Sequence, residues 1–373
     1  MTSHKSIGLL TWLASPNYGT NLQAFALFSA LKKLGYPTTF ICPFAVPSLK
    51  SLPRRMARHL LKFLHPRRHQ PPAPATKKSL RVARFIDEEI ARTRIRSRAD
   101  YHRLLRTTDV FCVGSDQLWN SYYTKDTFML LPWAKGVKRI SYATSIGTDD
   151  IAPDMRATYR RELRKFAHLS LREETGCRAI AALTSRTDVR RVLDPTLLLT
   201  PDDWRAVAQN AEADLPLPSP YILCYLIGAN AAYHAQLQDV QQRIGIPRII
   251  HLPAAEASDF TIPEAIRCED AGVREFLRLL DGAALVVTDS FHATALSINL
   301  RRPFIEFLRF PETAAANQNS RIHDLLSVFH LQNRLYAPDS AAWAEPLDYS
   351  PAASLLASAR ADSLAYLVNA IEA

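Results

Sequence analysis

The sequence has no stretch long and apolar enough to cross a membrane as a helix. Of its 373 residues, 47% are hydrophobic, but they occur in short runs. A spanning helix needs about 20 consecutive apolar residues and is therefore not expected. Residues 7–14 are apolar but lead into a polar loop and not into a small-residue cleavage site, so a signal peptide is not expected either. We expect a cytoplasmic protein.

Cysteine is scarce, and its spacing fits neither a metal site nor a redox motif. The five cysteines are odd in number, lie far apart and stand mostly among apolar residues. Such cysteines are typical of reduced thiols in the core of a cytoplasmic protein. We therefore expect no metal ion and no bound cofactor. The cysteines are Cys42, Cys112, Cys177, Cys224 and Cys268.

Acidic residues are absent from 44–85, although the chain has 36 of them against 46 basic residues. Within this basic insertion, 44–80, residues 52–64 follow a basic amphipathic pattern and 70–75 are Pro-rich. Residues 52–78 therefore predict attachment to an anionic membrane surface, peripheral at the inner face of the cell membrane. The alternative is an insertion that packs only on its own domain. Nucleic acid is not an expected partner, because no zinc finger, helix-turn-helix or aromatic RNA motif accompanies the charge.

The most informative segment is 280–307. An apolar strand at 284–287 is followed by capping residues, a helix that begins near His292, and a second strand at 304–307. A strand–helix–strand unit predicts a parallel sheet, in which ligands bind beyond the carboxyl ends of the strands. Ser290 and His292 lie at that end, where the helix N-terminus also offers free N–H groups. The alternative is that Ser290 only caps the helix and that His292 only packs.

The first residues predict a similar unit. Residues 7–12 form a strand, 13–20 a loop, and a helix capped by Asn21 precedes a strand at 38–41. The loop Asn17–Asn21, followed by Gln23, has the side chains to hold a sugar or an anion. It is not a dinucleotide-binding loop, because the second and third glycines are missing. An ordinary tight loop is the alternative.

Two further strand ends carry polar side chains. The strand at 109–113 is followed by Ser115, Asp116 and Gln117, and the strand at 168–171 is followed by Arg172. An arginine pairs with carboxylate and phosphate groups through two parallel hydrogen bonds. Arg172 is thus a candidate anion-binding residue, although an ion pair with Glu173 or Asp194 would explain it equally.

Seven short motifs occur in order along the chain, and together they resemble the polysaccharide pyruvyl transferase family over residues 6–335. The resemblance implies an α/β fold of two Rossmann-like domains facing across a cleft, GT-B-like. It also implies transfer of the pyruvyl group of phosphoenolpyruvate to two hydroxyls of one sugar, forming a cyclic ketal. The motifs are 17–24, 113–120, 141–147, 171–173, 193–196, 288–292 and 319–322.

The central motif departs from the pattern of much of the family. Where many members have Arg-Leu-His, this chain has Ser290-Phe291-His292 and lacks that arginine. The reaction needs groups that move protons and groups that hold an anionic donor. Residues matching the motifs then suggest the following roles. Catalysis is expected from His292 and Asp116, donor binding from Arg172, Ser290, His292 and Arg321, and acceptor binding from Asn17, Tyr18, Asn21, Gln23, Ser115 and Gln117.

The expected organisation is an N-terminal acceptor-side domain (1–165), a C-terminal donor-side domain (166–345) and a C-terminal helix (346–373). The expected partners are phosphoenolpyruvate, as a co-substrate, and a sugar or lipid-linked oligosaccharide. Two other functions fit the sequence. One is a GT-B glycosyltransferase that uses a sugar nucleotide, and the other is a non-catalytic member of polysaccharide assembly.

Overall fold

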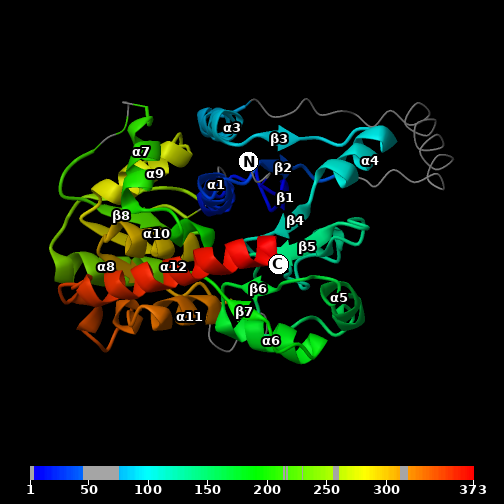
Figure 1. Ribbon diagram of the computed structural model, residues 1–373. Helices are drawn as coiled ribbons and strands as arrows, with labels where there is room; N and C mark the ends of the chain where they lie inside the picture. Colours follow the sequence, from blue (N-terminus) through cyan, green and yellow to red (C-terminus); the bar gives the residue numbers. More distant parts are fainter. Residues whose placement is uncertain are drawn as a thin grey trace, which may run out of the picture.

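Two parallel sheets with helices on both faces make up the computed structural model (Figure 1). The structure describes residues 4–44, 75–212, 215, 217–228, 230–254, 260–310 and 318–373. The first sheet has the order β3-β2-β1-β4-β5, and each pair is parallel. Its strands are β1 (Ile7–Leu10), β2 (Thr38–Ile41), β3 (Arg92–Thr93), β4 (Val110–Val113) and β5 (Lys138–Ser141).

The second sheet repeats this plan with the order β10-β9-β8-β11-β12, again parallel throughout. In both sheets the strand order reverses next to the central strand, between β1 and β4 and between β8 and β11. Ligands of open α/β sheets bind beyond the carboxyl ends at such points. The strands are β8 (Ile222–Tyr225), β9 (Ile249–His251), β10 (Ile266–Arg267), β11 (Leu285–Thr288) and β12 (Phe304–Glu306).

The helices cover both sheets, and two of them, α1 and α10, lie between the halves of the molecule. All ten residues of α10 are buried, which explains why its sequence shows no polar face. The helices are α1 (Tyr18–Lys33), α3 (Lys77–Glu89), α4 (Arg98–Thr107), α5 (Arg156–Leu163), α6 (Glu174–Thr184), α7 (Pro201–Gln209), α8 (Tyr233–Ile244), α9 (Val273–Gly282), α10 (Phe291–Leu300), α11 (Ser320–Val328) and α12 (Ser350–Glu372).

The start of α1 differs from the prediction that Asn21 caps the helix. Asn17 is the N-cap, and its side-chain oxygen accepts a hydrogen bond from the Gly19 amide at 2.9 Å. Asn21 lies inside the first turns, where its amide donates to the carbonyls of Ser15 and Asn17 at 2.8 and 3.1 Å. The helix begins earlier because Asn17 satisfies a free backbone donor of its first turn.

Backbone pairing continues the first sheet beyond β5. The strands β6 (Ser170–Leu171) and β7 (Arg190–Arg191) pair in parallel, and bridges from Ile140 to His168 and from Thr144 to Leu171 join β6 to the β5 side of the sheet. The sheet thus runs past the division expected at residues 165 and 166. Its extension brings Arg172 to the same edge as the end of β4.

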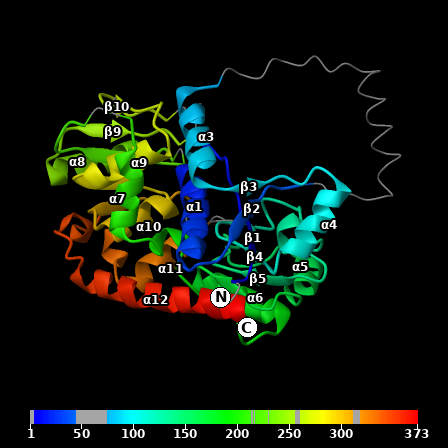
Figure 2. The same cartoon turned by 45° about the horizontal axis from the view of Figure 1, so that its top comes forward.

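One hydrophobic cluster spans both halves, each half has a further cluster of its own, and α12 crosses both halves (Figures 1 and 2). The amines of Lys5 and Lys138, in the first half, donate to the Ile371 carbonyl at 2.8 and 3.1 Å. In the second half, Arg360 donates to the Leu197 carbonyl at 2.7 Å. The two Rossmann-like domains and their facing strand ends confirm the predicted GT-B-like α/β fold.

Part of the predicted membrane-binding segment lies outside the described residues, namely 52–74. Its C-terminal end is described, and there Lys78 is buried rather than free to meet a surface. The Lys78 amine donates to the Pro253 carbonyl at 3.0 Å and lies 4.5 Å from the centre of the Tyr18 ring. Within the described segments, no helix combines the length and apolarity that crossing a membrane requires.

Candidate active site between the facing strand ends

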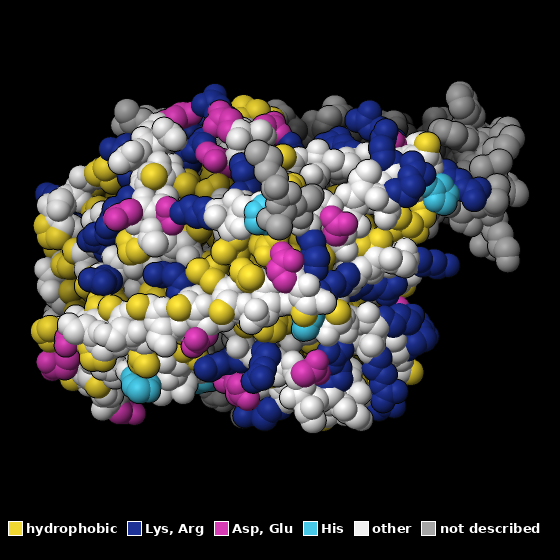
Figure 3. Space-filling model, in the orientation of Figure 1, with side chains coloured by type: hydrophobic (Ala, Val, Ile, Leu, Met, Phe, Trp, Pro, Cys, Tyr) yellow, Lys and Arg dark blue, Asp and Glu magenta, His cyan; other side chains and the backbone are white. Residues whose placement is uncertain are grey.

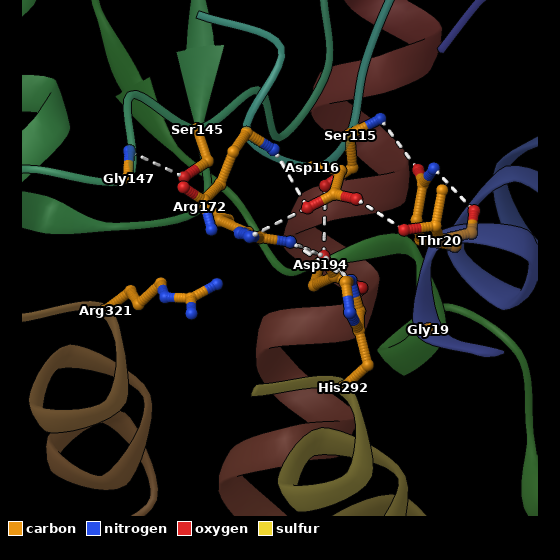
Figure 4. A network of polar contacts seen from close by, with 12 residues as sticks. Gly19, Thr20, Ser115, Asp116, Ser145, Gly147, Arg172, Asp194, His292 and Arg321 are labelled. Carbon is orange, nitrogen blue, oxygen red and sulfur yellow. Dashed lines mark hydrogen bonds and ion pairs between the residues drawn. The ribbon is translucent and has the colours of Figure 1, made fainter. Parts of the chain in front are cut away.

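A cavity of about 190 Å³ lies where the carboxyl ends of the two sheets face each other. Both halves supply its walls, and Figure 4 shows its central polar residues. The lining residues are Trp12, Asn17, Thr20, Asp116, Gln117, Tyr123, Ile227, Ser290, Phe291, His292, Arg309, Gln318 and Arg321.

His292 enters the cavity from the first turn of α10. Ser290 caps this helix, and its hydroxyl accepts from the Ala293 amide at 3.5 Å. The ring lies against Gly19 of α1, where an added β-carbon would be 2.3 Å from Nδ1. A residue larger than glycine at position 19 would therefore displace the ring. Ser290 both caps the helix and lines the cavity, and its role in donor binding stays a prediction.

Arg172 connects the acidic groups behind His292. Its side chain is 0% exposed, and its guanidinium donates to Asp194 at 2.8 Å and to Asp116 at 3.5 Å. Glu173 lies 3.7 Å from its Nε, and the same guanidinium stacks on the Phe291 ring at 4.1 Å. Arg172 is not among the residues that line the cavity of His292. The ion pairs with Asp194 and Glu173 that the sequence left open are thus present.

Arg172 also determines how His292 is oriented. One of its terminal nitrogens is 3.2 Å from Nε2 of His292, and Asp194 Oδ2 is 3.7 Å from the same atom. The tautomer of the ring decides the partner: an unprotonated Nε2 accepts from the guanidinium of Arg172, whereas a protonated Nε2 donates to Asp194. The remaining nitrogen, Nδ1, faces Gly19 at the cavity edge. Arg172 and Asp194 together hold the Nε2 edge of the ring.

The buried carboxylates are held ionised. Burial alone would raise the pKa of Asp194, but the charge of His292, a hydrogen bond with it and the charge of Arg172 lower that pKa below its ordinary range. For Asp116, burial is likewise outweighed by the charges of His292 and Arg172, and its pKa is lowered. Both groups are carboxylates at neutral pH. They balance the positive charge at the centre of the site.

Asp116 is positioned by a strained backbone and, besides Arg172, by two further donors. Its φ of 70° lies in the left-handed region, which non-glycine residues rarely adopt. Thr20 donates to one carboxylate oxygen at 3.1 Å, and the Gln117 amide donates to the other at 2.9 Å. The carboxylate therefore points into the cavity from the end of β4, as the sequence predicts.

Arg321 is a buried cation without an acidic partner among the described residues. Its side chain is 7% exposed, and its one hydrogen bond in the described chain is from Nε to the Gln318 carbonyl at 3.1 Å. Burial, followed by the charges of Arg309 and Arg172, lowers the pKa of Arg321 to about 9. Figure 4 shows the guanidinium reaching from α11 toward the network without joining it. An anion in the cavity would relieve this uncompensated charge.

Arg309 is a second cation of the cavity. It donates to the side chain and carbonyl of Asp289 at 3.2 and 2.9 Å. Asp289 is itself held by the amides of Ile227 and Gly228 at 2.6 and 2.7 Å and by the Tyr233 hydroxyl at 2.8 Å. Asp289 therefore ties the ends of β8 and β11 together and anchors Arg309.

The residues expected to bind an acceptor fall into two groups. Asn17 and Gln117 line the cavity, and the Gln117 amide donates across it to Gln318 at 2.9 Å. The other four are buried braces of the surrounding loops. The Tyr18 hydroxyl donates to the Ala271 carbonyl at 2.7 Å, Asn21 holds Ser15 and Asn17, Gln23 accepts from the Ser115 amide at 3.0 Å, and the Ser115 hydroxyl donates to Asp194 at 3.0 Å.

Several residues of the site have no assigned role in the sequence interpretation. Arg309 follows the end of β12, and an arginine beyond a parallel strand is a signal that sequence reading can use. Thr20 and Gln318 carry no such signal, because only the fold brings them to the cavity. No cluster of three or more potential metal ligands occurs in the described ranges.

Comparison with known proteins identifies a family for the chain. A family model described as "Polysaccharide pyruvyl transferase" matches residues 17–308. No curated protein matches the sequence at a significant level.

Among solved structures, the chain is similar to MurG of Acinetobacter baumannii, with 12% identity, a TM-score of 0.43 and 99% of each chain covered. It is also similar to the UDP-GlcNAc 2-epimerase of Neisseria meningitidis bound to UDP-GlcNAc, with 9% identity and a TM-score of 0.48 over 98% of this chain and 99% of that one. The putative UDP-N-acetylglucosamine 2-epimerase of Listeria monocytogenes matches with 10% identity, a TM-score of 0.46 and 97% of each chain covered.

Proposed function

Because the chain belongs to the polysaccharide pyruvyl transferase family, we propose that it transfers the pyruvyl group of phosphoenolpyruvate to two hydroxyls of a sugar. The sugar would be part of a cell-surface polysaccharide or its precursor. The product is a cyclic ketal. Phosphate is released, and the protein supplies binding, orientation and proton transfer without a cofactor.

The observation that carries this proposal is the uncompensated cation Arg321 beside His292. Phosphoenolpyruvate brings a carboxylate and a phosphate, and both pair well with arginine. Arg321 and Arg309 line the same cavity, and their guanidinium groups could pair with these two anionic groups. The cavity of about 190 Å³ is below the usual range of about 300–1,000 Å³ for ligand pockets, so it suits a small donor.

His292 is the residue proposed to move protons. The methylene carbon of phosphoenolpyruvate gains a proton to become a methyl group, and the first sugar hydroxyl attacks the neighbouring carbon. The second hydroxyl then replaces phosphate at that carbon. One hydroxyl proton ends on the methyl group and the other leaves with phosphate, so the atoms balance. Imidazole is suited to both transfers near neutral pH.

Asp116 is proposed to orient rather than to remove the proton. Its lowered pKa makes it a weak base but keeps it a charged hydrogen-bond acceptor at the cavity wall. A sugar hydroxyl that donates to Asp116 would present its lone pairs to the donor carbon. Ser290 and the first turn of α10 add hydrogen-bond donors next to the donor phosphate.

Arg172 is proposed to act mainly as a positioning residue. Direct donor contact, the role expected from the sequence, would require its fully buried guanidinium to leave Asp194 and Asp116. Its contact with Nε2 of His292 supports a role in fixing the ring. Arg321 and Arg309 would then make the contacts with the donor that the missing arginine of the central motif makes in other members of the family.

Calorimetric titration with phosphoenolpyruvate tests the proposal. The wild type should bind it, and Arg321→Ala should bind about ten- to a hundredfold more weakly, as expected for a lost charged hydrogen bond. Arg178→Ala, an exposed site on α6, serves as the matched control and should bind like the wild type.

Product analysis separates the rival functions. Incubation with phosphoenolpyruvate and a panel of glycosides should release phosphate and yield a ketal by mass spectrometry. Release of UDP from a sugar nucleotide without phosphate release would instead support a glycosyltransferase. Neither release, together with absent phosphoenolpyruvate binding, would support a non-catalytic protein.

A further inference from the structure

A second and larger cavity, of about 730 Å³, lies beyond the carboxyl ends of β1, β2 and β3. It is separate from the cavity of His292, but Trp12 lines both. Four arginines spaced two residues apart border it, and the described residues of its lining include no Asp or Glu. These arginines are Arg92, Arg94, Arg96 and Arg98.

Two of the four arginines have no side-chain partner within the part of the chain that the structure describes. The side chains of Arg94 and Arg96 form no hydrogen bond or ion pair with any residue in the described segments, whereas Arg92 pairs with Asp87 and Arg98 contacts His102 at 3.2 Å. The nearest acidic group of the following helix, Asp100, caps α4 and pairs with Arg103. The positive charge of the cavity is thus not neutralised from within the described chain.

Apart from Thr11 and Ser97, the other described lining residues are apolar or aromatic, with Phe40, Phe44 and Ile95 among them. A cavity with free arginines at one side and apolar surface at the other suits a ligand that joins an anionic group to a larger apolar or aromatic part. Lys and Arg side chains also gather over the half of the molecule that carries α4 and α5 (Figure 3). The positive electrostatic potential of this surface would favour the approach of a multiply charged anion.

We propose that this arginine cavity binds the diphosphate of the acceptor, a sugar carried on a diphosphate group. The inference rests on the proposed function, because it assigns the acceptor side of that reaction. One arginine side chain can donate two parallel hydrogen bonds to the oxygens of one phosphate. Two neighbouring arginines without other partners can therefore bind the two phosphates of a diphosphate. The carrier on the diphosphate is either a nucleoside or a polyprenyl chain, and both have the chemistry for the apolar wall.

The shared Trp12 explains how the two cavities would work together. The His292 cavity has room for the small donor and is too small to hold the acceptor as well. A sugar placed over Trp12 would extend its hydroxyls toward Asp116 and its diphosphate toward Arg94 and Arg96. The backbone at Trp12 is held for this role by Gln23, which donates to the Trp12 carbonyl at 3.3 Å.

Calorimetry with the full chain and inorganic diphosphate tests the site. The wild type should bind the probe, and Arg94→Gln/Arg96→Gln should bind it about ten- to a hundredfold more weakly. Arg84→Gln/Arg106→Gln removes the same charge from exposed positions on α3 and α4 outside the cavity. This control should bind diphosphate like the wild type. No binding to the wild type, or equal binding to Arg94→Gln/Arg96→Gln, would overturn the proposal.

Two more probes distinguish the carriers. UDP-GlcNAc binding more tightly than inorganic diphosphate, with dependence on Arg94 and Arg96, supports a nucleotide carrier. If farnesyl diphosphate binds more tightly than inorganic diphosphate, with the same dependence on Arg94 and Arg96, a polyprenyl carrier is supported. Phosphoenolpyruvate is titrated separately into each protein. Suppose that phosphoenolpyruvate binds neither the wild type nor any variant, while diphosphate binding is weakened by Arg94→Gln/Arg96→Gln. The diphosphate site is then supported and the proposed pyruvyl transfer is contradicted.

Discussion

The ring of His292 lies against the backbone of Gly19, so close that a β-carbon at residue 19 would be 2.3 Å from Nδ1. The two residues belong to the first turns of α10 and α1, the central helices of the two halves. The contact therefore joins the N-terminal ends of both helices at the cavity. The absence of a side chain at residue 19 determines where the proposed catalytic ring can lie.

Gly19→Ala should displace His292 without unfolding the protein. Overpacking of this kind costs about 1–3 kcal/mol, and a misplacement of about 1 Å lowers turnover by about 10²-fold. Chemical unfolding and steady-state kinetics measure the two effects. In a His292→Gly background the same change should cost little stability, because the ring and the β-carbon of residue 292, which would lie 2.3 and 2.6 Å from the new methyl group, are both gone. An unchanged cost in that background would mean that the alanine clashes elsewhere.

His292→Gln should lower turnover by about 10²–10⁴-fold, the range for a group that moves protons. The unfolding midpoint should change little, since glutamine retains polar contacts at the helix start. The KM for phosphoenolpyruvate distinguishes the roles of the ring. A constant KM supports proton transfer, whereas a rise in KM with little change in kcat supports phosphate binding.

Arg172→Ala should destabilise the protein by about 3–5 kcal/mol. Three buried carboxylates, Asp194, Asp116 and Glu173, would lose their shared counter-charge. Denaturant unfolding measures the loss, with Arg178→Ala as the control. A variant as stable as the wild type that has lost only phosphoenolpyruvate affinity would show instead that Arg172 holds the donor directly.

Glu306→Gln should become more stabilising as pH rises. Burial, and then the charge of Asp289, raises the pKa of the Glu306 carboxyl well above its ordinary value of 4.5. The folded protein thus holds this proton more tightly than the unfolded chain does. The resulting stability is complete below about pH 4.5 and is lost as pH rises through the folded-state pKa.

Thermal unfolding from pH 4 to 8 checks this expectation. The Tm of Glu306→Gln minus that of the wild type should increase with pH, because the amide stays uncharged and still reaches Thr294. Glu345→Gln, at an exposed position, should give a constant difference. If the Tm of Glu306→Gln and the Tm of the wild type change with pH in parallel, Glu306 does not hold a proton in the folded protein as assigned.

The basic insertion should bind anionic vesicles reversibly and in a salt-dependent manner. Each basic residue near an anionic surface contributes about 1 kcal/mol, and the attraction fades within a Debye length. Co-sedimentation at low and high ionic strength measures it. Replacement of Arg54, Arg55, Arg58 and Lys62 by Gln should abolish binding at low salt. Equal partitioning of both proteins would leave the insertion without this role.

Local sequence patterns predict much of the fold. The strand Thr38–Ile41 is predicted to the residue, and the capped helix after β11 begins where Ser290 indicates. These elements depend on neighbouring residues alone, through apolar runs and capping side chains. The start of α1 is predicted four residues late, because Asn17 and Asn21 are equally good caps in isolation.

The sequence by itself determined the two parallel-sheet halves, the family and the strand ends at which the site lies. Only the tertiary structure decided which polar residues meet the cavity, because the direction of a side chain depends on packing between distant segments. It buried Arg172 among three carboxylates, directed Tyr18 and Gln23 inward, and left Arg321 facing the cavity without an acidic partner in the described chain. Charge balance between residues far apart in sequence is a property of the assembled fold, and local patterns do not encode it.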